Sequence, residues 1–279
     1  NLKLFSGYET LVDITPAAYT PTGNNWKMVS FNNHVYMTQR QHVPLIGSDE
    51  AGSFVLETHT AHAHSTGTMP QANEILAAYG RLWAADLVNN KYTVYWSDLL
   101  DGSAWTGGSS GSIDLTTVWP TGFDEVVALS AHNGFLIIFG KRSILVYSGA
   151  ESPSTMVLAD VVAGVGCVAR DSVVATGTDL LFLSDQGVRS FARTIQEKSM
   201  PMRDISRNVR SDIIELVHQQ NNSIKAVYSA NEAFYLLSFP DSNIVYCFDM
   251  RTPLQDGSHR VTTWTGMNPL NFHVTLDAL

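Results

Sequence analysis

The sequence predicts an all-β fold of the β-propeller type, and three observations carry this prediction. Most of the 279 residues fall into short apolar or alternating runs that are rich in β-branched and aromatic side chains. Pairs of these runs flank tight Gly, Asn or Asp turns, which is typical of β-hairpins. The turns recur at a period of roughly 40–50 residues, the spacing of propeller blades rather than of a helical solenoid. A β-sandwich also has short strands, but it gives no reason for a strand triplet to recur at this spacing.

Five hairpin units follow one another along the chain, and four of them are followed by a third strand. Their turns are centred near Asn33, Gly80, Gly134, Thr178 and Asn231. The predicted strand pairs are residues 27–31 with 34–38, 75–79 with 81–85, 126–131 with 135–139, 172–176 with 180–184, and 224–229 with 233–239. The predicted third strands are residues 93–96, 144–147, 187–192 and 243–248. We therefore expect five blades from these units.

The two ends of the chain predict a sixth blade that they share. Leu4-Phe5-Ser6-Gly7 resembles Val146-Tyr147-Ser148-Gly149, which closes a third strand. Residues 272–276, followed by Asp277-Ala278-Leu279, are typical of a first strand that enters a turn. If the two halves form one blade, the ring closes without an open sheet edge. We therefore expect a single propeller domain over residues 1–279, and we interpret the chain as a fragment of a longer protein.

One segment, near residues 211–219, departs from the strand pattern. Its apolar residues stand at positions 213, 214, 216 and 217, which favours a short helix. Asp212 is the candidate N-cap, and Glu215 follows three residues later at the spacing of a capping box. Three arginines that we expect to be solvated precede the segment: Arg203, Arg207 and Arg210. We interpret the helix as a link between blades, with a docking element for a partner subunit as the alternative.

Charge and length exclude several classes of protein. The chain has 17 Lys+Arg and 26 Asp+Glu, hence a formal net charge of −9, and only 15% of its residues are charged. This balance argues against a sequence-reading nucleic-acid protein, which needs a basic face. No apolar stretch approaches the ~18 residues of a membrane-spanning helix, and no signal peptide is visible. Cys167 and Cys247 each lie in an apolar run, and we interpret them as buried thiols rather than a disulfide.

The segment His59-Thr60-Ala61-His62-Ala63-His64 is the strongest candidate for a metal site. In an extended strand His62 and His64 would share one face and His59 would point to the other. A metal site needs three or four ligands that converge. The sequence then continues into residues 65–70, which are typical of a loop. We therefore expect a solvated loop or a packing contact, with metal binding by His59, His62 and His64 as the alternative.

The segment from Ser97 to Trp105 is similar to the Asp-box turn of sialidase-type propellers, Ser-x-Asp-x-Gly-x-x-Trp, but it fails on spacing. Asp101 and Gly102 are adjacent here, whereas the pattern places one residue between them. Glycoside hydrolysis needs two carboxylates ~5–9.5 Å apart, and no pattern in the sequence pairs the candidates. We interpret the following carboxylates as turn and cap residues: Asp86, Asp98, Asp114, Asp160 and Asp185.

No catalytic motif stands out elsewhere in the sequence. A Gly-x-Ser-x-Gly elbow, a phosphate-binding loop and a Cys-x-x-Cys pair are all absent. Gly164-Val165-Gly166 is too short for a dinucleotide fingerprint and predicts a bulge or tight bend. Six aromatic residues are expected to pack between blades rather than form a ligand platform: Trp83, Tyr95, Trp96, Tyr147, Phe182 and Phe191. The sequence therefore predicts a non-enzyme, without catalytic, cofactor-binding or metal-binding residues.

Five segments carry a resemblance to a known family: residues 11–16 (LVDITP), 95–98 (YWSD), 138–149 (IFGKRSILVYSG), 166–174 (GCVARDSVV) and 181–191 (LFLSDQGVRSF). They resemble the tail nozzle proteins of short-tailed bacteriophages, also called tail tubular protein B or phage stabilisation proteins. The likeness covers most of the chain in order and rests on blade motifs. It implies a structural virion protein, a β-propeller subunit of a homo-oligomeric ring, typically a hexamer. The ring would lie in the tail below the portal and adaptor proteins, near tail fibres or spikes.

The resemblance also implies a role in genome ejection. The ring would form the distal conduit that retains the genome and later passes it, with DNA sliding through the lumen without specific binding. Few cationic side chains mean weak phosphate adhesion, which suits such a wall. Nozzle proteins usually carry additional domains, so a gate loop or platform domain is expected outside this sequence. A carbohydrate-binding or glycan-hydrolysing propeller is the alternative function, and a WD-type scaffold is a third, although Trp-Asp strand ends are absent.

Overall fold

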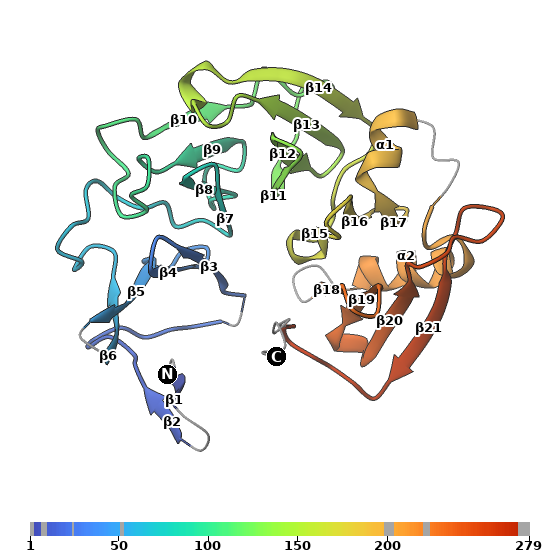
Figure 1. The fold of residues 1–279 in the computed structure, drawn as a ribbon, viewed down its shortest axis with the longest axis horizontal. Helices are drawn as coiled ribbons and strands as arrows, with labels where there is room; N and C mark the ends of the chain where they lie inside the picture. Colours follow the sequence, from blue (N-terminus) through green and yellow to red (C-terminus); the bar gives the residue numbers. More distant parts are fainter. Residues whose placement is uncertain are drawn as a thin grey trace. The chain divides into compact units, whose positions relative to one another are not determined.

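The computed structural model describes residues 3–6, 10–23, 25–50, 53–197, 204–219 and 224–272. They form antiparallel sheets of two to four strands and two short α-helices (Figure 1). The predicted all-β β-propeller fold is confirmed. The chain divides into two compact units, one of residues 1–118 and 149–157 and the other of residues 119–148 and 158–279. Across the described residues, no helix is long and apolar enough to cross a membrane.

Unit 1 contains two four-stranded sheets and one two-stranded sheet, each with its strands in chain order. The first blade consists of β3 (Lys27–Phe31), β4 (His34–Thr38), β5 (Leu45–Glu50) and β6 (Ser53–Thr58). The second blade consists of β7 (Glu74–Ala78), β8 (Arg81–Ala85), β9 (Thr93–Trp96) and β10 (Gly111–Asp114). The two-stranded sheet pairs β1 (Lys3–Ser6) with β2 (Thr10–Asp13).

Unit 2 contains three further blades and both helices. Two of these blades have four strands. One consists of β11 (Val126–His132), β12 (Phe135–Gly140), β13 (Ser143–Ser148) and β14 (Val157–Ala163). The other consists of β18 (Lys225–Ser229), β19 (Phe234–Phe239), β20 (Ile244–Asp249) and β21 (Arg260–Thr265). The blade between them in sequence has β15 (Val174–Ala175), β16 (Leu180–Ser184) and β17 (Gly187–Ser190). The helices are α1 (Phe191–Glu197) and α2 (Arg210–Gln219). The described part of unit 2 also has 3₁₀ turns at Arg170–Ser172, Arg207–Val209 and Pro240–Ser242, whereas the 3₁₀ turn Pro153–Thr155 belongs to unit 1.

The hairpins form at the predicted turns because the turn residues accept left-handed backbone. Asn32 and Asn33 have φ of 47° and 64°, and they join β3 to β4. Asn133 and Gly134 have φ of 49° and 80°, and they join β11 to β12. Two consecutive residues with positive φ give the turn whose twist matches that of the flanking strands, and Asn and Gly adopt it at low cost. The register of both ladders follows from these turns.

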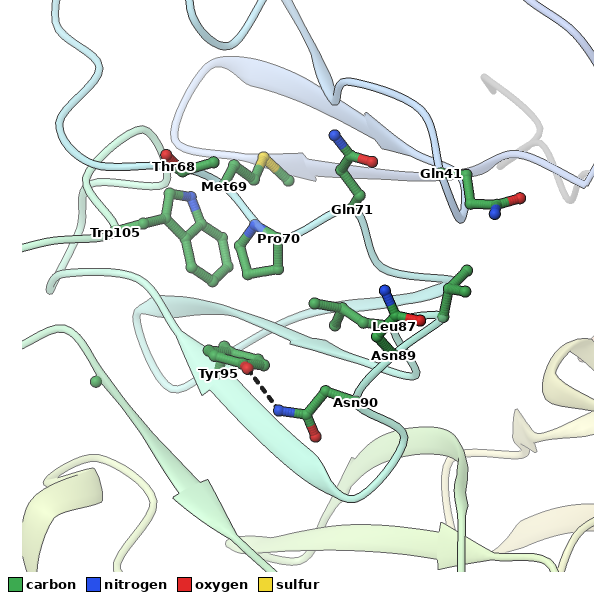
Figure 2. A pocket seen from close by; sticks show the side chains of 12 residues that line it. Gln41, Thr68, Met69, Pro70, Gln71, Leu87, Asn89, Asn90, Tyr95 and Trp105 are labelled. Carbon is green, nitrogen blue, oxygen red and sulfur yellow. Dashed lines mark hydrogen bonds between the residues drawn. The ribbon is translucent and has the colours of Figure 1, made fainter.

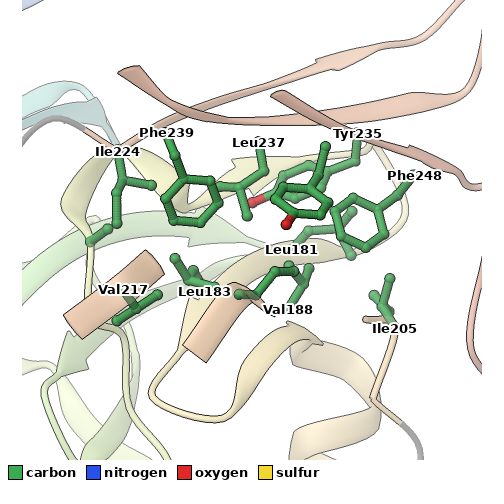
Figure 3. Packing of buried hydrophobic residues seen from close by; sticks show 13 residues of the cluster. Leu181, Leu183, Val188, Ile205, Val217, Ile224, Tyr235, Leu237, Phe239 and Phe248 are labelled. Atoms are coloured by element: carbon green, nitrogen blue, oxygen red, sulfur yellow. The ribbon is translucent and has the colours of Figure 1, made fainter. Parts of the chain in front are cut away.

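The apolar runs are continuous because the inner strands are buried on both faces. In unit 2, one cluster joins the β11–β14 sheet to β16, with the ring centroids of Phe139 and Phe182 5.1 Å apart. A second cluster joins β16 and β17 to β19 and β20, and α2 closes it with Ile213 and Val217 (Figure 3). In unit 1, Tyr36, Ile46 and other residues of the first blade pack against Ile75 and Leu82 of the second. Five of the six predicted packing aromatics are buried, and Tyr95 alone among them is not.

The predicted strand pair of each of the five hairpins is confirmed within one or two residues, except that β15 is shorter than predicted. Residues 170–172 form a 3₁₀ turn, so only Val174 and Ala175 of that predicted strand pair with β16. The fourth strands were missed, and most of their residues are exposed or half-buried, as in β21, where five of six residues are exposed. Edge strands with polar outer faces are how sheets avoid unwanted pairing.

The predicted third strand at residues 187–192 is wrong at its end. The strand stops at Ser190, and Phe191 begins helix α1, which the sequence analysis missed. Ser190 Oγ accepts the Arg193 N–H at 3.2 Å, and Asp179 Oδ1 accepts the Ala192 N–H at 2.9 Å. These acceptors satisfy the free donors of the first turn, so Ser190 acts as a helix cap. Ser190, three residues before Arg193, was the signal in the sequence for the start of this helix.

The short helix predicted near 211–219 is confirmed as α2, with two corrections. The helix begins at Arg210, so Asp212 lies inside its first turn rather than at the cap. Arg210 is not simply solvated, since its Nη1 lies 3.5 Å from Asp204 Oδ2 and its Nη2 donates to Gln186 Oε1 at 3.0 Å. Arg207 is exposed as expected, and Arg203 lies outside the described residues.

The described residues form five blades, whereas the sequence predicted six. Lys3–Ser6 was expected to close a blade with residues 272–276, but β1 pairs with β2, with Lys3 opposite Asp13. A hairpin with its sequence neighbour closes a far shorter loop than pairing with the other chain end, and short loops cost less entropy. Residues 273–276 of the expected partner strand lie outside the described residues.

The Gly164-Val165-Gly166 segment is the predicted tight bend, and it gives a stability test. A Cβ on Gly166 would lie 2.2 Å from the Lys141 carbonyl carbon and 2.4 Å from the Arg142 nitrogen, whereas one on Gly164 would meet nothing within 4 Å. We expect Gly166→Ala to lower the free energy of unfolding by about 3 kcal/mol, because backbone must move. The control Gly164→Ala should lower the free energy of unfolding by only about 1 kcal/mol, because its side chain meets no atom and the only cost is the backbone strain at a φ of +78°. Urea denaturation measures both, and an equal or larger loss in Gly164→Ala would contradict the packing argument.

Candidate functional site

Unit 1 contains a cavity of about 530 Å³ whose walls come from loops of both of its blades. This volume lies within the range of small-molecule sites, roughly 300–1,000 Å³. The walls are the turn after β4, the segment between β6 and β7, and the hairpin between β8 and β9 (Figure 2). The lining residues are Gln41, Thr68, Met69, Pro70, Gln71, Leu87, Val88, Asn89, Asn90, Tyr95, Trp105 and Gly111. We call this cavity the amide pocket, after its four carboxamide side chains.

The buried carboxylate of Asp86 fixes the three loops that wall the amide pocket. It forms an ion pair with Arg40 Nη2 and accepts a hydrogen bond from Asn73 Nδ2 at 2.8 Å. The Asp86 carbonyl also accepts the Asn73 N–H at 3.1 Å. Arg40 directly precedes Gln41, Asn73 follows Gln71 by two residues, and Asp86 directly precedes the hairpin at residues 87–90. Charge-assisted hydrogen bonds of this kind are the stronger ones in proteins, so one side chain sets the spacing of three loops.

Two half-buried aromatic rings form part of the lining, and their polar atoms are already engaged by the protein. Trp105 Nε1 donates to the Gly102 carbonyl at 2.9 Å, and Tyr95 Oη accepts from Asn90 Nδ2 at 2.9 Å (Figure 2). Trp105 also packs against the apolar cluster of Tyr36, Ile46, Met69, Ile75 and Leu82. The Trp105 donor is therefore used within the protein, whereas Tyr95 Oη, which accepts from Asn90, keeps its own O–H for donation.

The amide pocket is polar without being charged. Of its twelve lining residues, none is Asp, Glu, Lys, Arg or His. The carboxamides come from Gln41, Gln71, Asn89 and Asn90, and each offers both donors and an acceptor. Such a surface suits groups that both donate and accept hydrogen bonds. Sequence reasoning missed this site because its residues are spread over loops between positions 41 and 111.

The structure places the three predicted histidines on turns and does not make them converge. His59 is buried, and its Nε2 donates to the Ser103 carbonyl at 2.8 Å. His62 Nδ1 lies 2.6 Å from Glu57 Oε1, and its ring contacts those of His34 and His64 at centroid distances of 5.6 and 5.9 Å. Among the residues described, no three His, Cys, Asp or Glu side chains are arranged to hold a metal ion.

The segment that is similar to an Asp box forms a compact structural turn. Asp98 Oδ1 accepts hydrogen bonds from the backbone of Leu99 and from the backbone and hydroxyl of Ser109. These bonds hold the pKa of Asp98 below its usual value. Asp101 Oδ1 accepts from the backbone and hydroxyl of Ser103, at 2.9 and 2.6 Å. The interpretation as a turn is confirmed, and the turn carries Trp105 into the amide pocket.

The remaining predicted residues have structural environments. Asp114 and Asp160 accept hydrogen bonds from backbone N–H groups one or two residues later, as expected of turn residues, and Asp185 is exposed at the β16–β17 turn. Asp86 differs, because it is buried in the ion pair described above. Cys167 and Cys247 are buried thiols rather than a disulfide, as predicted, and burial raises the pKa of the Cys247 thiol.

Comparison with known proteins gives distant structural similarity alone. No family model matches the chain, and no curated protein matches it. Hsv2 of Kluyveromyces lactis is 13% identical with a TM-score of 0.48, covering 87% of this chain and 74% of that chain. The AfRom2 CNH domain is 12% identical with a TM-score of 0.46 over 90% and 75% of the two chains. A streptogramin B lyase is 10% identical with a TM-score of 0.43 over 86% and 68%. The fold assignment rests on the sheets themselves.

The buried His59 predicts a loss of stability in acid. Burial lowers the pKa of His59, and its Nδ1 is buried without a hydrogen-bond partner, so a second proton there would find no acceptor. The unfolded chain therefore binds this proton at higher pH than the folded chain, and stability falls as the pH drops below about 6.5. We expect His59→Asn to reduce the loss of unfolding free energy between about pH 7 and pH 5. Urea denaturation across this range measures it.

The control for His59 is His64→Asn, because His64 is exposed on the following turn. This variant should keep the wild-type pH dependence. Some acid sensitivity remains in His59→Asn, since burial also lowers the pKa of His259. Identical pH profiles for His59→Asn and His64→Asn would show that His59 is not the sensitive group.

Asp86→Ala tests the carboxylate that joins the three loops. The change leaves Arg40 and Asn73 without their partner, and we expect it to lower the unfolding free energy by about 3 kcal/mol. Asp114→Ala is the control, because Asp114 is an exposed turn carboxylate of the same blade, and its effect should be much smaller. Denaturant titration of both variants gives the comparison, and similar losses would rule out a special role for Asp86.

Proposed function

We propose that this chain is a structural subunit of the tail nozzle of a short-tailed bacteriophage. The observation that carries the proposal is the ordered series of segments that resembles nozzle proteins. Three of them, residues 138–149, 166–174 and 181–191, cover strands and connections of two consecutive blades of unit 2. They include the close backbone approach at Gly166 and the buried strand β16. These segments form the strands and turns of the blades, so the resemblance concerns the fold of the subunit rather than a catalytic site.

The scarcity of positive charge supports a conduit. Each copy has a formal net charge of −9, and several of its cations are held in ion pairs inside the subunit. Lys27 Nζ lies 2.7 Å from the buried Glu74, and Lys225 pairs with Asp171. A cation committed to a carboxylate is less available to phosphate. DNA affinity depends on such phosphate contacts, so a wall of this composition lets DNA slide.

The proposal includes a sixth blade, a ring and virion partners. In the sixth blade, the β1–β2 sheet would be completed by residues 272–276. Six copies would then form the ring in the tail, below the portal and adaptor proteins and beside fibres or spikes. The contacts between copies would be heterologous, and such contacts close only at a fixed rotation. The subunit would be structural and carry no enzymatic activity.

Imaging of the full-length protein tests this function. We expect negative-stain electron microscopy to show rings with a central hole, and a gel-shift assay at about 50 mM salt to show no retention of duplex DNA. A protein that stays monomeric at micromolar concentration would contradict the nozzle. Strong, salt-dependent DNA binding would contradict the proposed wall, because a basic lumen would hold the genome back.

A further inference from the structure

We infer that the amide pocket of unit 1 is a binding site for a neutral oligosaccharide. The inference rests on the pocket's charge, its hydrogen-bonding groups, its aromatic surface and its fixed shape. It goes beyond the nozzle proposal and does not depend on it.

The absence of charge from the lining selects the class of ligand. Phosphates, carboxylates and sulfates are bound by Arg, Lys or clustered backbone N–H groups, and ammonium groups by carboxylates or aromatic cages. None of the twelve lining residues carries a charge. Arg40 and Asp86, the sequence neighbours of the lining residues Gln41 and Leu87, neutralise each other in their ion pair. A charged ligand would lose its hydration without an opposite charge in return, so the pocket favours an uncharged one.

The carboxamides supply the hydrogen-bond partners that hydroxyl groups need. A sugar hydroxyl donates one bond and accepts others, and a carboxamide does both from adjacent atoms. Gln71 and Asn89 are exposed, and their side chains make no hydrogen bond to another described residue. Two hydrated carboxamides at one pocket favour a ligand rich in hydroxyls, because its hydroxyls can replace the water on both donors and acceptors.

The two rings supply the apolar half of the site. A pyranose has a face of C–H groups as well as a rim of hydroxyls, and such a face packs on aromatic rings. Trp105 and Tyr95 are only half-buried, and their polar atoms bond to Gly102 and Asn90. In Figure 2 the rings of Trp105 and Tyr95 lie on one side of the pocket, with Leu87 and Asn89 across from them. Ring surface and carboxamides in one pocket match the two chemistries of a sugar.

The pocket is also built to keep its shape. Met69 is fully buried in the cluster beneath it, and Leu87 and Asn90 exchange backbone hydrogen bonds at 3.1 and 3.3 Å across a two-residue turn. The Asp86 ion pair holds the loops at residues 40–41 and 86–90 together. A preorganised site loses less entropy when a ligand binds. A volume of about 530 Å³ suits a short oligosaccharide better than one small metabolite.

Glycan binding to this chain tests the inference directly. The probes are an array of neutral, sialylated and sulfated glycans, followed by calorimetric titration of maltotriose, cellotriose, chitotriose and the best neutral glycan of the array. We expect at least one neutral probe to bind with a dissociation constant of about 1 mM or tighter. Because no ion pair contributes, its affinity should stay constant between about 50 and 500 mM NaCl.

Two variants locate the binding. The double variant Gln71→Ala/Asn89→Ala removes exposed side chains, so it should fold normally and weaken binding about tenfold or more. Trp105→Ala should abolish binding, but it also removes a ring that packs on the core cluster. Trp264→Ala is its matched control, since Trp264 is a 38% exposed tryptophan of β21 in unit 2, and it should bind like wild type.

Three results would overturn the inference. The first is no neutral probe binding at about 10 mM. The second is binding that the Gln71→Ala/Asn89→Ala variant leaves unchanged. The third is selective binding of sialylated or sulfated probes that weakens with salt. None of these results bears on whether the full-length protein forms rings, so failure here is distinguishable from failure of the nozzle proposal.

Discussion

Apolar packing between consecutive sheets is the constraint on which the rest of this structure depends. A single sheet with apolar faces must bury them against another element, so each blade packs against a neighbour. Phe139 against Phe182 in unit 2, and Tyr36 with Ile46 against Ile75 and Leu82 in unit 1, are the contacts that do this. The same requirement explains why inner strands such as β8, β12 and β16 are buried while outer strands such as β21 are largely exposed.

Charged residues are few in this chain, and several of those that are buried position loops. Asp86 joins the loops that wall the amide pocket, and Glu74, fully buried, receives Lys27 from the neighbouring blade. In unit 2, Asp171 pairs with Arg170 and Lys225. Breaking a buried pair costs far more than the pair contributes over an apolar substitute. These ion pairs therefore determine the positions of the loops that they join, while the apolar clusters supply most of the stability.

The residues that line the amide pocket differ from those that hold its loops in place. Rigid blades hold short loops, and the loops present side chains that are not needed for folding. Gln71 and Asn89 are exposed and without partners among the described residues, whereas the residues directly behind them, Asn73 and Asp86, are committed to holding the loops. A structural subunit of a larger assembly and a carrier of a surface binding site are compatible on such a scaffold, because the two roles use different residues.

The sequence by itself determined the propeller, the five hairpins and helix α2, because hydrophobic period and turn chemistry are local properties. Asn133-Gly134 can be recognised as a hairpin turn without knowing what surrounds it. The tertiary structure decided the rest. It ended β17 at Ser190, where Asp179 and Ser190 cap a helix, and it paired β1 with β2. It also gathered Gln41, Asn89 and Trp105 around one cavity. These outcomes depend on contacts between residues that are distant in sequence, and no local pattern encodes which distant loops will meet.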